Sequence, residues 1–283
     1  MSDPTLQLAP APLGALAPML REEPGLVAAL GRSSTVLVVP DAAQAVAVAG
    51  LVHLSRRSPV VVAMPTAADA ERLAADLLAF LPTDAVELFP AWETLPFERV
   101  SPSIETMGRR VRTLWQLRTQ DPALSVVVAT ARALVQRLGP HVEDAEPIQV
   151  VSGGRIDSDE LIEQLVGIGY RREYQVEHRG ELAVRGSIID VFPATADAPV
   201  RIDLWGDEVE RLCEFSVSDQ RATVELDAVR IFGARELLPS DEVRARAEQL
   251  VSSQRWGREQ WQRLADGEVF EGMEAWLAWL ADG

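Results

Sequence analysis

Residues Val39–Gln44 occupy the place where an α/β nucleotide-binding fold carries its phosphate loop, between a strand-like run and an apolar helix. A working phosphate loop needs glycine for close backbone approach, lysine for the β/γ-phosphates and Ser or Thr for magnesium. The segment Val-Pro-Asp-Ala-Ala-Gln contains none of these residue types, and Asp41 would repel a phosphate while capping the helix. We therefore predict a nucleotide-binding type of fold that has lost its nucleotide site, with no cofactor.

Other residue types that could carry catalysis are few and scattered. All 27 cationic residues are arginine, so chemistry that requires a lysine amine is excluded. The three histidines lie far apart, and one cysteine, Cys213, gives no zinc motif. The acidic pairs Asp207-Glu208 and Asp241-Glu242 fall at a hairpin turn and at a helix N-terminus, where acids are favoured electrostatically. We predict no catalytic residue and no metal site, and hence no enzyme activity for this chain.

Four arginines gather in the middle of the chain: Arg171, Arg172, Arg179 and Arg185. Residues 144–229 are otherwise strongly acidic, with 8 Arg against 19 Asp and Glu, a net charge of −11. Cations on an acidic surface are commonly solvated ion-pair partners that contribute little. Arginine is also enriched among the residues that dominate protein interfaces. Both interpretations stay open at this point.

The elements that would position these residues follow from the hydrophobic pattern. Short apolar runs alternate with helical patterns in the first third of the chain, which indicates a parallel sheet covered by helices. Strands are predicted at 36–39, 59–64, 86–89 and 125–129, and helices at 42–54, 67–81, 104–117 and 131–138.

The middle of the chain has a different pattern. After a helix at 159–166, strand signals separated by tight turns indicate an antiparallel meander. These strands are predicted at 174–178, 181–184, 187–192, 200–205 and 208–216, and helices return at 241–252, 258–264 and 272–280. The predicted organisation is a degenerate nucleotide-binding-like α/β domain at 1–145, an inserted α+β domain at 146–229, and a helical return segment to the first domain at 230–283.

Composition sets the broad class. The chain has 283 residues, 47% of them hydrophobic, and a net charge of −16. That charge argues against a generic nucleic-acid binder, whose footprint is basic. No signal peptide and no clean apolar stretch of membrane-spanning length is visible, and a lone cysteine fits a reducing compartment, so we expect a cytoplasmic protein without membrane contact. The apolar run Trp276–Leu280 suggests that further partner sequence follows.

Several long motifs resemble one family. The segment 88–102, LFPAWETLPFERVSP, resembles the hallmark segment of the bacterial transcription-repair coupling factors (Mfd), as does 216–221, SVSDQR. The runs 181–193 and 200–210, ELAVRGSIIDVFP and VRIDLWGDEVE, look like the second domain that these factors share with UvrB. UvrB itself keeps a phosphate loop and a long DNA-threading hairpin, whereas only 23 residues separate Pro102 from Val126 here. The resemblance is therefore to the N-terminal UvrB-like module of the coupling factors, with a degenerate RecA/UvrB-like fold.

The resemblance implies a role. In that family the whole protein removes stalled RNA polymerase with a DNA translocase motor and recruits the excision-repair protein UvrA. RNA polymerase and DNA are contacted through domains absent here, and this module would be a non-catalytic docking surface for UvrA, which the motor and C-terminal domains of the full-length chain could mask. Two alternatives remain: an ATPase and DNA clamp like UvrB, and an intramolecular brake on the motor.

The resemblance also implies the docking residues. The exposed arginines of UvrB correspond by motif to Arg172 and Arg185, with Arg171 as a lesser candidate. A third UvrB arginine corresponds to Ala183, so the chain departs from the pattern there. Phe192 aligns with an aromatic that could add an apolar anchor, and is equally well interpreted as a core strand residue.

Overall fold

The computed structural model describes residues 11–55, 57–95 and 98–280. The chain divides into two compact units. The first unit comprises residues 1–91 and 116–136, and the second comprises residues 92–115 and 137–283. The chain therefore crosses between the units three times. The predicted three-part division at 145 and 229 stays a prediction.

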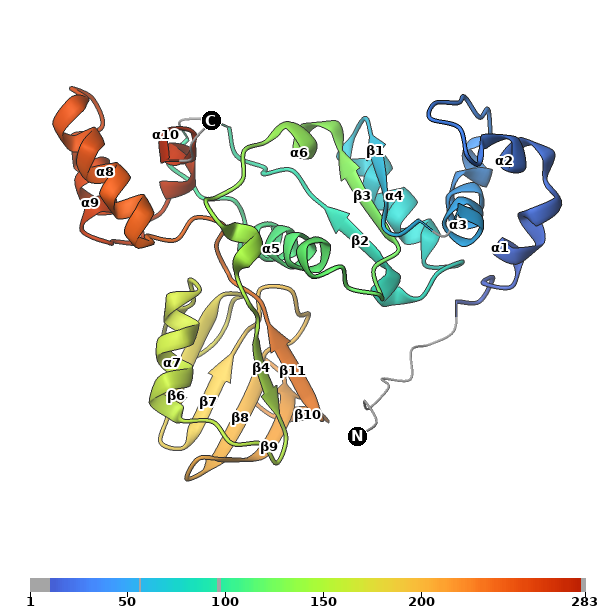
Figure 1. Ribbon diagram of the computed structural model, residues 1–283. Coiled ribbons are helices and arrows are strands. Elements are labelled where there is room, and N and C mark those ends of the chain that lie inside the picture. The colour runs from blue at the N-terminus through green and yellow to red at the C-terminus, as the bar shows by residue number, and fades with distance from the viewer. Residues whose placement is uncertain (1–10, 56, 96–97, 281–283) are drawn as a thin grey trace. The chain divides into compact units, whose positions relative to one another are not determined.

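The first unit contains a parallel sheet of β1 (Val60–Met64), β2 (Val86–Phe89) and β3 (Val126–Thr130) in the order β1-β3-β2 (Figure 1). Its core joins the inner side of the sheet to the two longer helices of this unit, α3 (Gln44–Ser55) and α4 (Ala67–Leu77). Thr66 caps α4 by accepting a hydrogen bond from the Asp69 N–H at 3.1 Å. The remaining helices are α1 (Leu16–Met19), η1 (Leu20–Glu22), α2 (Pro24–Ala29), η2 (Asp41–Ala43), η3 (Thr83–Ala85) and α6 (Ala131–Val135).

The predicted strand at 36–39 is wrong. Residues 35–40 carry no strand in the structure, and the side chains of Val36 and Val38 are 87% and 93% exposed. Leu37 and Val39 instead line an apolar pocket of about 370 Å³ together with α3 and β1. A β-branched run forms a strand only where a neighbouring backbone is free to pair with it. Here the run packs through alternate side chains without joining the ladder.

The second unit contains a six-stranded sheet in the order β10-β9-β8-β7-β6-β5, which is antiparallel except for the β5–β6 pair. A separate two-stranded sheet pairs β11 with β4, antiparallel. The strands are β4 (Ile148–Val151), β5 (Arg171–Arg172), β6 (Glu181–Arg185), β7 (Ile188–Val191), β8 (Val200–Trp205), β9 (Glu208–Phe215), β10 (Ala222–Glu225) and β11 (Ala228–Ile231). The predicted fold class, an α/β chain with a parallel sheet and a distinct antiparallel α+β part, is confirmed.

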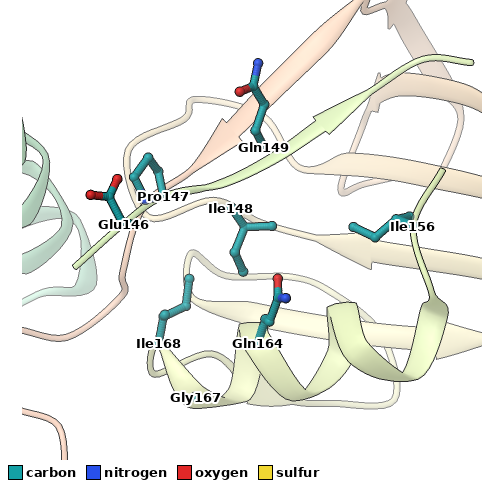
Figure 2. A pocket seen from close by; sticks show the side chains of 8 residues that line it. All are labelled: Glu146, Pro147, Ile148, Gln149, Ile156, Gln164, Gly167 and Ile168. Carbon is teal, nitrogen blue, oxygen red and sulfur yellow. The ribbon is translucent and has the colours of Figure 1, made fainter. Parts of the chain in front are cut away.

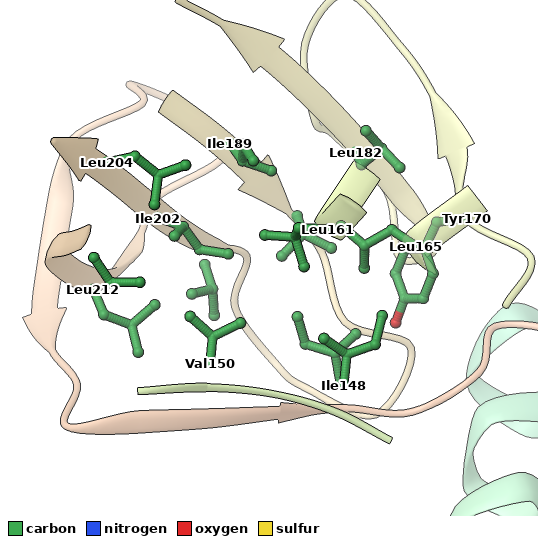
Figure 3. Packing of buried hydrophobic residues seen from close by; sticks show 14 of the residues in the cluster. Ile148, Val150, Leu161, Leu165, Tyr170, Leu182, Ile189, Ile202, Leu204 and Leu212 are labelled. Atoms are coloured by element: carbon green, nitrogen blue, oxygen red, sulfur yellow. The ribbon is translucent and has the colours of Figure 1, made fainter. Parts of the chain in front are cut away.

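One face of the six-stranded sheet, here called the inner face, is buried. Leu182, Ile189 and Ile202 from this face pack against α7 (Ser158–Gly167) and against β4 (Figure 3). Leu161 and Leu165 are the fully buried contacts that α7 contributes. Because side chains alternate along a strand, the residues between these apolar positions lie on the opposite, outer face. The outer face carries most of the charged residues of the sheet.

The strand expected at 174–178 is also wrong. Tyr174 is 90% exposed, and the backbone N–H groups of Glu177 and His178 donate to the Glu181 carboxylate at 2.8 and 2.9 Å. A carboxylate that takes these N–H groups leaves them unavailable to a sheet ladder. The strands β4, β5, β10 and β11 were not predicted.

The rest of the second unit is helical. It contains α5 (Ile104–Thr119, residues 104–115 of which belong here), η4 (Val142–Asp144), α8 (Asp241–Ser253), α9 (Arg258–Ala265), η5 (Met273–Trp276) and α10 (Leu277–Leu280). A buried ion pair of 2.9 Å joins Arg110 on α5 to Glu236, which also accepts a hydrogen bond from the Trp92 indole. A second buried pair joins Arg235 to Glu274 at 2.5 Å. These pairs fasten the segment 92–115 and the helical segment onto residues 235–236.

Two glycines permit close backbone approach in this unit. A Cβ at Gly139 would lie 2.0 Å from the Glu236 carbonyl oxygen, and one at Gly108 would lie 2.4 Å from the Ala194 Cβ. Neither distance is compatible with a side chain. The contacts of α5 and of residue 139 with their neighbours therefore require glycine at both positions.

Candidate protein-interaction site

Asp190 organises the centre of the outer face. It lies on β7 opposite Ala183 of β6 and Arg201 of β8, and its side chain is fully buried. Arg201 binds it through two hydrogen bonds, Nε to Oδ1 at 2.7 Å and Nη2 to Oδ2 at 2.9 Å. These hydrogen bonds raise the pKa of the Arg201 guanidinium. The pair is bidentate, which fixes the orientation of both side chains.

Arg185, a predicted site residue, is the second cation on this carboxylate. Its Nη2 donates to Asp190 Oδ2 and lies 3.5 Å from Gln220 Oε1. The Arg185 side chain remains 41% exposed, whereas that of Arg201 is 16% exposed. The hydrogen bond to Asp190 therefore fixes the orientation of the Arg185 side chain, while part of its guanidinium stays exposed to solvent. Such preorganisation lowers the entropy lost when a partner carboxylate binds.

Arg171 and Arg172 form the short strand β5 at the edge of the sheet, and both are exposed. Arg171 is in register with Glu181, and Arg172 with Leu182. Arg172 is in register with Leu182, which belongs to the inner-face core, so Arg172 lies on the inner side of the sheet edge. Arg171 then lies on the outer face together with Arg185. Arg171 Nη2 lies 3.8 Å from Glu181 Oε1. The structure thus brings Arg171, rather than Arg172, to the face that carries Arg185.

Phe192, also a predicted site residue, is 7% exposed. It packs in a small cluster with Val176, Ala183 and Phe215, and the Arg179 guanidinium lies 5.3 Å from its ring centroid. Ala183, the position to which the resemblance assigns a third UvrB arginine, is fully buried in the same cluster. The position of Phe192 matches its interpretation as a packing residue under the outer face.

Two exposed aromatic residues were missed by the sequence analysis. Trp205 ends β8 with 77% of its surface exposed, and Tyr174 follows β5 with 90% exposed. On β8 the core residues alternate with Arg201 and Asp203, so Trp205 continues the outer-face row. The signal was available in the sequence, because the alternation of Val200, Ile202 and Leu204 assigns position 205 to the face opposite the core.

The loop that stands in the place of a phosphate site begins a helix differently from a phosphate-binding loop. Asp41 opens the 3-10 turn η2, and its Oδ1 accepts a hydrogen bond from Gln44 Nε2 at 3.2 Å. A carboxylate therefore lies at the N-terminus of α3. Within the described residues, no group of three or more His, Cys, Asp and Glu is arranged to hold a metal ion. No helix in the same part of the chain is both long and apolar enough to span a membrane.

Comparison with known proteins agrees with this architecture. Residues 148–237, which begin with β4 and end after β11, match the family model of the UvrB interaction domain. The chain is 39% identical over 269 residues to the transcription-repair-coupling factor of Mycobacterium bovis, covering 89% of this chain and 22% of that protein. It is 32% identical over 225 residues to the factor of Escherichia coli, covering 77% and 19%, and 32% identical over 186 residues to that of Bacillus subtilis, covering 65% and 16%.

The chain spans about one fifth of the length of these curated relatives. Its similarity to the Mycobacterium bovis factor covers both units. The family-model match falls on the part of the second unit that contains the six-stranded sheet with its outer face. The chain belongs to the transcription-repair-coupling factor family, as its N-terminal UvrB-like module.

Proposed function

We propose that this chain is a non-catalytic docking module for the excision-repair protein UvrA, within a coupling factor that releases stalled RNA polymerase at lesions in the cytoplasm. The motor, the polymerase contacts and the DNA contacts would belong to other parts of the full-length protein. The observation that carries the proposal is Arg185, which is partly exposed and oriented by a fully buried carboxylate in the middle of a UvrB interaction domain.

The chemistry of this face suits an acidic partner surface. Arg185 and Arg171 lie on the outer face of one sheet, and Trp205 adds an exposed aromatic surface on the same face. Arginine and tryptophan are the residue types that most often dominate binding energy at interfaces. Guanidinium groups bind carboxylates through paired hydrogen bonds, which give orientation together with affinity. We therefore place the UvrA contact on the outer face, with Arg172 reaching it from the sheet edge.

The experiment measures UvrA affinity by calorimetry for Arg185→Ala, Arg171→Ala, Arg172→Ala and Trp205→Ala. The matched control is Arg263→Ala on α9, whose side chain is 39% exposed and paired with Glu268 at 2.7 Å, close to the 41% of Arg185. We expect Arg185→Ala to lose about 2 kcal/mol of binding free energy and the control to lose almost none. Melting temperatures should stay near that of the unmodified chain for all five variants.

Two results would overturn the proposal: unchanged UvrA affinity in all four variants, Arg185→Ala, Arg171→Ala, Arg172→Ala and Trp205→Ala, or an equal loss in Arg263→Ala. If Arg185→Ala loses both UvrA binding and thermal stability, Trp205→Ala decides between a lost contact and a damaged fold. The Trp205 side chain is exposed, so its truncation leaves the core intact. The alternative of an intramolecular brake would use the same face. It predicts that Arg185→Ala in the full-length protein raises the ATPase rate, whereas a pure UvrA-docking role predicts no change.

A further inference from the structure

A groove runs between β4 and α7 in the second unit (Figure 2). It has a volume of about 540 Å³, and its apolar wall is formed by Ile148, Ile156 and Ile168. Ile148 comes from β4 and Ile168 follows the end of α7, so the two elements face each other across the groove. Both elements cover the inner face of the six-stranded sheet. The groove is therefore separate from the arginine-bearing outer face.

One edge of β4 directs backbone hydrogen-bonding groups away from β11 and toward this groove. Ser152 donates its N–H to the Asp227 carbonyl at 2.9 Å, which makes 152/227 a hydrogen-bonded pair of the β4–β11 ladder. Pairs alternate in an antiparallel ladder, so Val150 and Ile148 also bond to β11, while Gln149 directs its N–H and C=O to the opposite edge. Gln149 lines the groove. A strand edge beside an apolar channel is the geometry that accepts an added extended peptide.

The groove continues into an acidic end. A second hollow of about 340 Å³ shares Ile156 and Gln164 with the first. It is lined by the carboxylates of Asp157, Glu160 and Asp207 and by the cation Arg155. The Asp157 carboxylate caps α7 by accepting the N–H groups of Asp159 and Glu160, each at 2.9 Å. Glu160 Oε1 accepts a hydrogen bond from Gln164 Nε2 at 3.0 Å. Three carboxylates at one end of an apolar channel favour a cationic group on whatever occupies it.

We propose that this groove binds an extended peptide segment that carries an aliphatic side chain followed, one or two residues on, by lysine or arginine. The peptide adds a short strand to the free edge of β4 through the backbone of Gln149. Its aliphatic side chain enters the channel among Ile148, Ile156 and Ile168, and its cation lies between Glu160 and Asp207. Pro147 has no N–H to donate, so pairing starts at Gln149 and stays short. Affinity then depends on the side chains.

The test uses the 283-residue chain and a fluorescein-labelled pentapeptide, Lys-Thr-Ile-Thr-Lys, with binding followed by fluorescence anisotropy at low salt. We expect a Kd on the order of 10–100 µM, since a short peptide loses much of its interaction energy to ordering. Replacing both lysines of the peptide by glutamate, or N-methylating its central isoleucine, should each weaken binding at least about tenfold.

Variants of the protein locate the site. Glu160→Arg combined with Asp207→Arg reverses the charge of the acidic end, and Gln164→Trp fills the channel from the exposed side of α7. Glu163→Arg is the matched control, because Glu163 is exposed on the same helix and lies outside both hollows. Each groove variant should weaken peptide binding at least about tenfold, and the control less than about twofold. Circular-dichroism melting checks that all variants are folded.

Absence of saturable binding to the unmodified chain would overturn the proposal. So would binding that survives Gln164→Trp, or that falls as strongly in Glu163→Arg as in the groove variants, since either result describes diffuse charge attraction. Loss of binding on N-methylation without loss on charge reversal would refute the cationic part of the assignment. If Gln164→Trp fails to fold, the charge-reversal variant and its control decide the question alone.

Discussion

Asp190 is the residue on which the geometry of the candidate site depends most. It is fully buried and receives hydrogen bonds from Arg185 and Arg201, so its charge is balanced by two cations of unequal exposure. Ala183 lies directly across from it and leaves room for the Arg185 side chain to reach down. The exposed arginine and its buried partner form one structural arrangement, and in the proposed complex only the arginine would touch a partner protein.

Replacing Asp190 by asparagine should therefore destabilise the second unit. The variant leaves a partly buried guanidinium without its counter-charge, and we expect a loss of roughly 3 kcal/mol in the free energy of unfolding. Urea denaturation measures the change. Asp219→Asn is the control, because the Asp219 side chain is half exposed and its ion pair with Arg221 is long, at 4.0 Å. Its unfolding curve should be nearly unchanged. Equal curves for the two variants would contradict the role assigned to Asp190.

His141 provides a test of charge at an exposed position. Its Nδ1 lies 3.3 Å from Asp144 Oδ2 and its Nε2 lies 3.1 Å from Glu242 Oε2. The hydrogen bond to Asp144, assisted by the charge of Glu242, raises the pKa of His141 above its ordinary value. A raised pKa in the folded state stabilises the fold below the unfolded pKa, and that contribution disappears as the pH rises through the folded value.

Imidazole proton shifts followed by NMR across pH 5–9 give this pKa directly. We expect the pKa of His141 in the unmodified chain to lie above the ordinary value of a histidine side chain. The pKa of His141 should fall in Glu242→Gln and in Asp144→Asn. A value at or below the ordinary one in the unmodified chain would show that the two carboxylates do not act on His141 in solution.

At the scale of elements, the sequence predicted periodic segments well and pairing partners poorly. The helix expected at 104–117 is α5, and the strands expected at 200–205 and 208–216 are β8 and β9, because their alternation and turns are local signals. The strand expected at 36–39 has strong local propensity but no neighbour with which it pairs. Conversely, β11 contains only four residues and is defined by its pairing with β4. In that pair Ala228 lies opposite Val151, which is 77 residues earlier in the chain.

The candidate site follows the same division. Arg185 and its exposure could be predicted from a strand end beside a glycine turn. The choice between Arg171 and Arg172 could not, because it depends on the register of a two-residue strand against β6. The buried position of Phe192 depends on Val176 and Phe215, which come from a loop and from β9. Contacts between distant segments decide these roles, and no local pattern encodes them.

The N-terminus of α3 leads to a prediction about nucleotide binding. Asp41 occupies the first turn, and Gln44 donates to its carboxylate, so a negative charge lies where a phosphate would need backbone donors. We expect no heat of ATP binding in calorimetry at millimolar nucleotide, with or without magnesium, and no release of phosphate. Saturable micromolar binding would refute this and favour an ATPase like UvrB.

At the scale of the whole molecule, charge governs encounters with nucleic acid. The chain carries a net charge of −16, and the exposed arginines of the outer face are interspersed with carboxylates such as Glu225, which pairs with Arg211. Neutralisation of phosphates supplies most non-specific DNA affinity. We expect no shift of a 30-base-pair duplex by micromolar protein at about 0.15 M salt in a gel assay. A complex at submicromolar protein would contradict the docking-module assignment.

The two glycines of close approach affect how genetic data on this protein will look. Every substitution at Gly139 introduces a Cβ 2.0 Å from the Glu236 carbonyl, and every substitution at Gly108 introduces one 2.4 Å from Ala194. A saturation-mutagenesis screen scored by DNA-repair survival would therefore rank both positions as intolerant, beside Arg185. Protein abundance measured in the same cells separates the two classes. The glycine variants should be lost from the soluble fraction, whereas an Arg185 variant should stay abundant and lose only repair function.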